Sequence, residues 1–118
     1  MLRSNASQVA SLWLPNPANN LAAAGSSQST AAAIPAGQDL SIFTSVSSGQ
    51  GCSLPGVGVC VAETYAVANH GANTLLVYPV LGGQIGTLGA NVGYSLSAGH
   101  EAHFTCVAGV GKAWTCCP

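Results

Sequence analysis

The sequence predicts an all-β fold, an antiparallel sandwich or jelly-roll-like barrel that is preceded by an extended N-terminal arm. Two observations predict this fold class. Short runs of β-branched and aromatic residues recur about every ten residues after residue 37, a spacing typical of sandwiches and barrels. Gly, Pro, Asn and Ser separate these runs, as turns between strands require. We therefore expect one β domain over residues 37–118.

The first 36 residues differ in composition from the rest of the chain. They are rich in Ala, Ser, Asn and Gln, and Pro15, Pro17 and Pro35 interrupt them. Their Ala-rich stretches lack the apolar residues at i, i+3, i+4 and i+7 that a packed helix needs. We expect an arm over residues 1–36 that contacts other subunits, so that deletion of residues 1–30 leaves the β domain folded.

Leu12, Trp13 and Leu14 form the apolar group of this arm. Two interpretations of the group stay open. It packs back onto its own domain, or it inserts into a neighbouring subunit as a Trp anchor does at an interface. We therefore name these three residues as the candidate interface.

Alternation and turn residues place the strands of the β domain. Leu40, Ile42 and Thr44 alternate with their neighbours in the first strand. The run 74–78 has the strongest strand pattern and ends at Pro79. The turn residues 69–73 before it predict a hairpin with the preceding strand. The expected strands are 39–46, 59–68, 74–78, 91–96, 102–108 and 112–116.

Charged side chains are unusually rare. Only Arg3, Asp39, Glu63, Glu101 and Lys112 are charged, which is 4% of the chain, against about 25% in an ordinary soluble domain. Because few charges also leave strand edges without repulsion, we expect much of the surface to be buried against other subunits. Two basic residues cannot form the patch that DNA or RNA requires. No apolar run is long enough for a membrane-spanning helix.

Five cysteines are a high and odd number for this length. At most two intrachain disulfides can form. A hairpin that turns at residues 109–111 would bring Cys106 beside Cys116, within reach of a disulfide. Cys117 would face the other side and pair with Cys52 or Cys60 of the same chain or of a neighbour. In the alternative interpretation, Cys60 and Cys106 are simply small buried apolar residues.

The remaining reactive side chains form no catalytic or metal pattern. The adjacent Cys116 and Cys117 lack the spacing of zinc ligands, and so do the three histidines, which lie in or near turns. Glu63 and Glu101 have no spacing that brings them together as an acid/base pair. The glycine clusters lack a phosphate-binding spacing. We expect no enzyme, no metal and no cofactor.

Trp114 and Tyr94 have two possible uses. Exposed on a surface, they would stack on a sugar, which keeps a carbohydrate-binding module among the alternatives. Within predicted strands, they would pack in the core.

A series of turn and strand-end motifs runs from Val67 to Trp114. It comprises N-x-G-A-N at 69–73, V-Y-P at 77–79, a Gly-rich turn with Ile85, S-L-x-A-G at 95–99, F-x-C at 104–106 and the closing Trp114. This pattern is similar to a family of small structural proteins of tailed bacteriophages. The resemblance covers less than half of the chain, and the cysteines other than Cys106 lie outside the pattern.

The resemblance implies a virion protein with no catalytic residues. Together with the scarcity of charge, it leads us to expect a capsid decoration (cement) subunit on the capsid surface. Its expected partners are the major capsid protein and copies of itself, as a homotrimer. The alternatives are a tail, baseplate or fibre component of the particle and, less favoured, a secreted carbohydrate-binding module.

Overall fold

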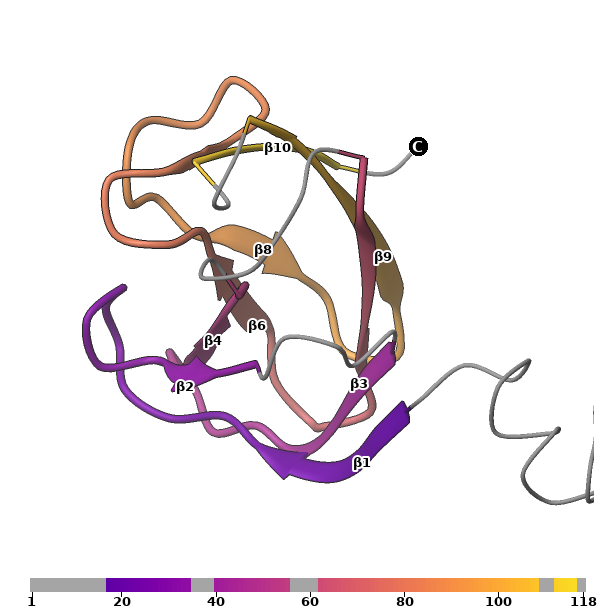
Figure 1. The fold of residues 1–118 in the computed structure, drawn as a ribbon. Coiled ribbons are helices and arrows are strands. Elements are labelled where there is room, and N and C mark those ends of the chain that lie inside the picture. The colour runs from indigo at the N-terminus through magenta and orange to yellow at the C-terminus, as the bar shows by residue number, and fades with distance from the viewer. Residues whose placement is uncertain (1–16, 35–39, 56–61, 109–111, 117–118) are drawn as a thin grey trace, which may run out of the picture.

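The computed structural model describes residues 17–34, 40–55, 62–108 and 112–116. Within these ranges the chain has ten strands and no helix (Figure 1), which confirms the predicted all-β class. No helix that could span a bilayer is found in this part of the chain. The strands are β1 (Pro17–Ala22), β2 (Ala32–Ala33), β3 (Leu40–Ser45), β4 (Gly51–Ser53), β5 (Thr64–Asn69), β6 (Leu75–Tyr78), β7 (Gln84–Ile85), β8 (Tyr94–Leu96), β9 (Glu101–Ala108) and β10 (Ala113–Cys116).

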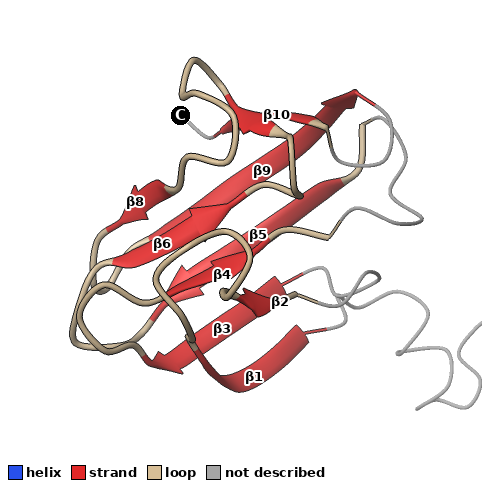
Figure 2. Cartoon of the chain, turned by 90° about the vertical axis from the view of Figure 1, so that its left-hand side faces the viewer, coloured by secondary structure: helices blue, strands red, loops and turns tan. Residues whose placement is uncertain are grey.

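The strands form two sheets. The larger has the order β1-β3-β5-β9-β10-β7, and the smaller has the order β2-β4-β6-β8. From β1 to β6 the chain alternates between the sheets, so that each pass adds one strand to both (Figures 1 and 2). The added strands are parallel, with Leu40 opposite Ala66 in the larger sheet and Cys52 opposite Val77 in the smaller. This stacking is solenoid-like.

The later strands reverse direction. β8 runs antiparallel to β6, β9 runs antiparallel to β5, and β10 returns antiparallel to β9. β7 lies parallel to β10 at the edge of the larger sheet. Five of the eight pairings among the described strands are parallel, so the expectation of an antiparallel sheet is wrong.

The hairpin expected before the run 74–78 is also wrong. β5 and β6 follow each other in the chain, but they belong to different sheets. Alternating side chains and turn residues indicate where strands begin and end, and they do not fix which strands pair. The turn at residues 70–74 carries the chain from one sheet to the other.

The predicted arm boundary at residue 36 does not match the structure either. Residues 17–34 contain β1 and β2, which pair with β3 and β4. Ala23 and Ile34 are buried in the core at 7% and 3% exposure. This part of the predicted arm belongs to the β domain. Leu12, Trp13 and Leu14, the candidate interface, lie outside the described residues.

One hydrophobic core contains side chains of both sheets. The larger sheet supplies Phe43, Phe104 and Trp114, and the smaller sheet supplies Leu75 and Val77. Burial alternates along β9, where Phe104 and Cys106 are buried and His103 is exposed, as the sequence predicts. The rings of Tyr65 and Trp114 pack edge to face, with ring centroids 5.9 Å apart and an interplanar angle of 71°.

The outer strands of both sheets are poorly suited to pairing with another chain. β2 and β7 have two residues each, and β8 has three. β1 begins with Pro17, its register shifts beside β3, and Asn20 has a positive φ of 58°. Short, bulged and Pro-containing edges oppose strand addition. The scarcity of charge therefore does not leave these edges unprotected, contrary to expectation.

Candidate functional site at the Ser26–Ser29 turn

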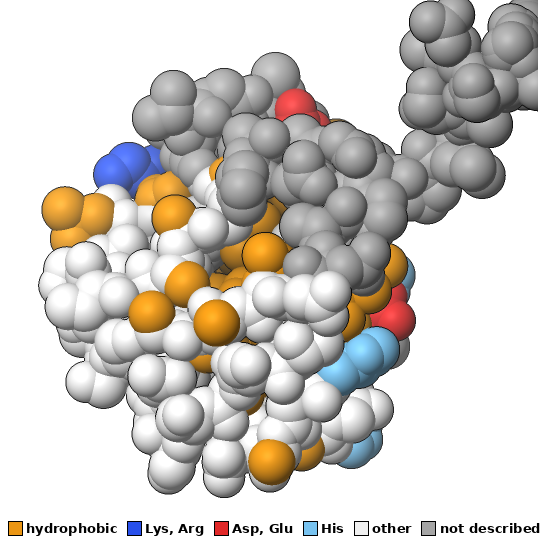
Figure 3. All heavy atoms as spheres, turned by 90° about the horizontal axis from the view of Figure 1, so that it is seen from below, with side chains coloured by type: hydrophobic (Ala, Val, Ile, Leu, Met, Phe, Trp, Pro, Cys, Tyr) orange, Lys and Arg blue, Asp and Glu red, His pale blue; other side chains and the backbone are white. Residues whose placement is uncertain are grey.

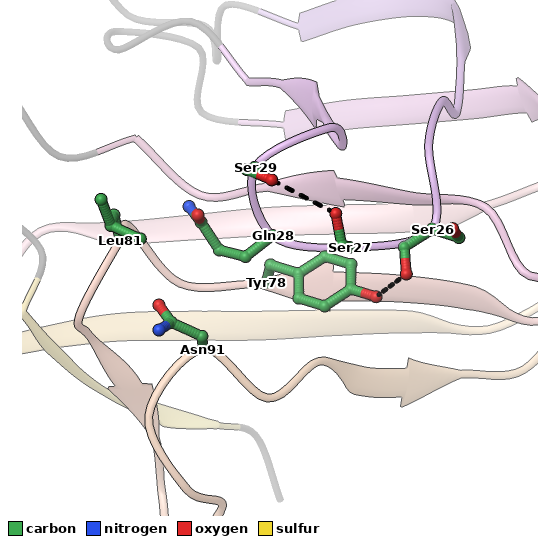
Figure 4. Close-up of a pocket in the computed structure, with 7 residues that line it drawn as sticks. All are labelled: Ser26, Ser27, Gln28, Ser29, Tyr78, Leu81 and Asn91. Atoms are coloured by element: carbon green, nitrogen blue, oxygen red, sulfur yellow. Dashed lines mark hydrogen bonds between the residues drawn. The ribbon is translucent and has the colours of Figure 1, made fainter.

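A cavity of about 410 Å³ opens where the turn after β1 meets the loops that follow β6 and β7 (Figure 4). One turn, two loops and the end of one strand contribute its lining. The turn supplies four consecutive polar residues, the end of β6 supplies an aromatic ring, and the loops supply one apolar and one amide side chain. The lining residues are Ser26, Ser27, Gln28, Ser29, Tyr78, Leu81 and Asn91.

Hydrogen bonds hold the Ser26–Ser29 turn in one shape. Thr30 Oγ1 accepts hydrogen bonds from the backbone N–H groups of Ser26 and Ser27, both at 3.2 Å. Gly25 starts the turn with a φ of 66°, and a Cβ there would collide with the backbone oxygen and hydroxyl of Thr30. Gln28 Nε2 then donates to the backbone oxygen of Pro79 at 3.1 Å, which fastens the turn to the end of β6.

Tyr78 is wedged between two glycines. A Cβ at Gly51 would lie 2.8 Å from one edge of the ring, and a Cβ at Gly93 would lie 3.0 Å from the other. A side chain at either position would crowd the ring, which is 7% exposed. Its hydroxyl donates to the backbone oxygen of Ser26 at 3.2 Å (Figure 4).

The opposite wall consists of two loops that are tied to each other. Asn91 Oδ1 accepts a hydrogen bond from Gly82 N at 2.6 Å, and Asn91 N donates to Gly83 O at 2.9 Å. Leu81 lies in the first loop and is 67% exposed beside the cavity. Lys112 Nζ donates to the backbone oxygen of Leu81 at 3.0 Å.

The cavity presents hydroxyls and amides without charge. None of its seven lining side chains is a carboxylate, an ammonium, a guanidinium or an imidazole. The groups that line it donate and accept hydrogen bonds. The arrangement is therefore suited to binding.

The candidate cysteines are only partly described. Cys52 and Cys106 are fully buried free thiols. Burial raises the pKa of the Cys52 thiol far above its usual range, because the apolar surroundings disfavour the thiolate. Cys106 Sγ donates to the backbone oxygen of Ala108 at 2.9 Å. Cys60 and Cys117 lie outside the described residues.

The expected disulfide between Cys106 and Cys116 is not formed. β9 and β10 do lie side by side, but the register places Cys106 opposite Trp114 and Cys116 opposite Phe104. The pairing shifts between Ala113 and Trp114, and a shift of this kind cannot be inferred from strand alternation. Cys116 takes part in a disulfide, and neither free thiol is its partner.

The titratable side chains are paired locally or exposed. Glu63 accepts a hydrogen bond from the hydroxyl of Tyr65 at 2.9 Å. Glu101 and His103 form an exposed pair at 3.2 Å on β9. Among the described residues, no three His, Cys, Asp or Glu side chains are grouped as a metal site would require. Glu63 and Glu101 therefore each have a different local partner and do not pair with each other.

The two aromatic residues considered for sugar stacking both pack inside the domain. Trp114 is 1% exposed, and Tyr94 is half-buried with its ring against the edge of Phe104 at a centroid distance of 5.6 Å. Core packing is therefore the use that the structure gives to Trp114. Trp114 therefore has no face free for a sugar, whereas Tyr94 borders a second pocket beside Ile85 and Leu88.

None of the residues that line the cavity is among the site residues predicted from the sequence. Ser26 to Ser29 lie in a segment that we expected to form an arm, and Asn91 was assigned to the start of a strand. A usable signal was present, because Gly25 followed by Ser and Thr is typical of a turn held by side-chain hydroxyls. The long-range contact with Pro79 has no counterpart in the local sequence.

Comparison of the chain with protein-family models, with curated proteins and with solved structures finds no match. The resemblance of residues 67–114 to small structural proteins of tailed phages therefore stays a prediction.

Proposed function

We propose that the chain is a structural subunit of a tailed-phage particle, a capsid decoration protein that binds the outside of the shell and stabilises it. The observation that carries the proposal is the scarcity of charge on a folded domain. Only five of the 118 side chains are charged, and on the face shown in Figure 3 most of the described side chains are hydrophobic or uncharged, with the charged ones at its margins. Such a surface favours a protein that is permanently bound to other subunits over a free monomer.

Exposed apolar side chains support the same proposal. Leu81, Val92 and Val107 are 67%, 44% and 49% exposed. Leu81 and Val92 lie in the two loops that Asn91 ties together. Because the outer strands are short or bulged, contact through loops and sheet faces is favoured over strand addition.

The proposed partners are the major capsid protein and two further copies of this chain. A domain of this size has a small core, and burial at an interface adds apolar contacts that the isolated domain lacks. In this proposal the two sheets pack face to face as a sandwich-like body, although most of the pairings among the described strands are parallel. We propose no catalytic role.

Copy number tests the proposal. The chain should be quantified in purified particles of the encoding phage by mass spectrometry with isotope-labelled peptides, against the major capsid protein. A decoration protein is expected in hundreds of copies, because it follows the symmetry of the shell, whereas a tail-tip or baseplate part follows the tail symmetry with about a dozen or fewer. A low count favours the tail, baseplate or fibre alternative, and absence from the particle refutes both.

A further inference from the structure

The polar side chains of the Ser26–Ser29 cavity have a defined set of unused hydrogen-bonding groups. Gln28 uses its Nε2 on Pro79 O, which leaves its Oε1 as an acceptor. Asn91 uses its Oδ1 on Gly82 N, which leaves the two hydrogens of its Nδ2 as donors. Among the described residues, the hydroxyl of Ser26 has no partner, and that of Ser29 contacts only Ser27 Oγ at 3.4 Å. The cavity thus offers one fixed acceptor, one fixed donor and two hydroxyls that can do either.

These groups are held in place before any ligand arrives. The turn is fixed by Thr30 and by the bond to Pro79, the Tyr78 ring by the two glycines, and the facing loop by Asn91. A site that is already ordered does not lose side-chain freedom on binding, so even weak contacts contribute to affinity. Figure 4 shows the side chains of Gln28, Leu81 and Asn91 around one opening.

The chemistry of the lining selects a class of ligand. Phosphates and carboxylates are disfavoured because none of the side chains that line the cavity is cationic. Cations are disfavoured because no carboxylate lines it. The cavity offers a fixed acceptor, a fixed donor and two serine hydroxyls. A neutral ligand with several neighbouring hydroxyl groups matches this set, because each hydroxyl can both donate and accept a hydrogen bond. Leu81 adds one exposed apolar side chain, against which the C–H face of such a ligand can pack.

We infer that the cavity lined by the Ser26–Ser29 turn, Leu81 and Asn91 is a binding subsite for a neutral glycan. Neighbouring sugar hydroxyls are bound by Gln28 Oε1 and Asn91 Nδ2, while the sugar ring lies against Leu81. The subsite needs no aromatic platform. It is independent of the structural role proposed above, since a decoration protein and a tail component could both carry it.

Chemical-shift changes in ¹H–¹⁵N spectra of the full chain test the inference. The probes are neutral oligosaccharides of glucose and of N-acetylglucosamine, with oligogalacturonate as an anionic comparison and a Ser/Gly-rich peptide as a neutral non-sugar comparison. We expect saturable changes in residues 25–31, 80–83 and 91 with at least one neutral oligosaccharide, at a dissociation constant of about 1 mM or below. The two comparison probes should give none.

Two variants and one control make the test specific. Asn91→Asp keeps the oxygen that accepts from Gly82 N and removes the Nδ2 donors, so we expect binding to weaken about tenfold or more. Leu81→Ser should weaken it by a similar factor, whereas Val92→Ser, the same kind of change outside the cavity, should leave it unchanged. The inference is overturned if no neutral oligosaccharide binds, if the peptide or the anionic sugar binds instead, or if both cavity variants bind as tightly as the unmodified chain.

Discussion

The side-chain amide of Asn69 connects the two sheets, because its Nδ2 donates to the backbone oxygen of Leu96 at 2.9 Å. Asn69 ends β5 in the larger sheet, and Leu96 ends β8 in the smaller one. The same Nδ2 donates to Asn73 O at 2.8 Å, and Oδ1 accepts from Gly71 N at 3.0 Å. The amide is fully buried, and its polar atoms are satisfied. Asn69 therefore shapes the turn that sends the chain to the other sheet.

Replacement of Asn69 by Ala should destabilise the domain strongly. Three hydrogen bonds are lost at about 1 kcal/mol each, and buried backbone groups lose their partner, so we expect a loss of about 2–4 kcal/mol in the free energy of unfolding. Asn73→Ala is the matched control, because the exposed Asn73 makes one side-chain bond, to Val46 O at 2.8 Å, worth about 1 kcal/mol. Urea denaturation measures both, and equal losses would contradict the role assigned to Asn69.

Truncation should show that residues 17–34 of the predicted arm contribute to the stability of the β domain. Removal of residues 1–16 leaves every described strand intact and serves as the comparison. Removal of residues 1–30 deletes β1, its ladder with β3 and the buried Ala23, which should cost more than about 3 kcal/mol. Thermal unfolding followed by circular dichroism compares the two, and similar midpoints would refute the assignment of residues 17–34 to the β domain.

The fold class could be predicted because it depends on local signals. The pattern of β9 placed Phe104 and Cys106 inside and His103 outside, and the structure has them so. Pairing between strands could not be predicted, because the interactions that decide it join distant residues. Asn69 with Leu96 is one such pair, and Gln28 with Pro79 is another.

The strands β1 and β2 could not be predicted from the sequence for a different reason. Their residues are small and polar, since β1 reads PANNLA and β2 consists of Ala32 and Ala33. Short edge strands bury few large side chains, so the β-branched signal that marks a central strand is missing from them. The candidate cavity could not be predicted either, because the Ser26–Ser29 turn that lines it lies between these two strands.

Gly51→Ala should disturb the packing around Tyr78. The new Cβ would lie 2.8 Å from the Tyr78 ring and would collide with the backbone oxygen of Leu76 in the neighbouring strand, so we expect a loss of about 1–3 kcal/mol. Gly89→Ala is the control, because its Cβ would meet only Val92 at an ordinary 3.5 Å. Chemical denaturation of both variants checks this, and a Gly51→Ala protein as stable as Gly89→Ala would show that the ring is free to move.

Alkylation should divide the cysteines into two chemical classes. In the folded protein, iodoacetamide should leave Cys52 and Cys106 unmodified, because both are fully buried. In denaturant without reductant these two should react, whereas Cys116 should react only after reduction. Mass spectrometry of peptides gives the result, and comparison of Cys60→Ser with Cys117→Ser shows which change frees Cys116. Rapid modification of Cys106 in the folded state would contradict its burial.

The burial of Cys52 should make the stability of the domain depend on pH in alkaline solution. Its folded-state pKa is raised, so the folded chain keeps the thiol proton at pH values where the unfolded chain loses it. The stabilising effect is complete below the unfolded pKa of about 8.5 and is lost as the pH rises above it, by up to about 1.4 kcal/mol per pH unit. Unfolding free energies at pH 7, 8, 9 and 10 should therefore fall more steeply for the unmodified chain than for Cys52→Ala, which carries the same tyrosines and Lys112. Parallel curves for the two proteins would mean that Cys52 ionises equally in the folded and unfolded states.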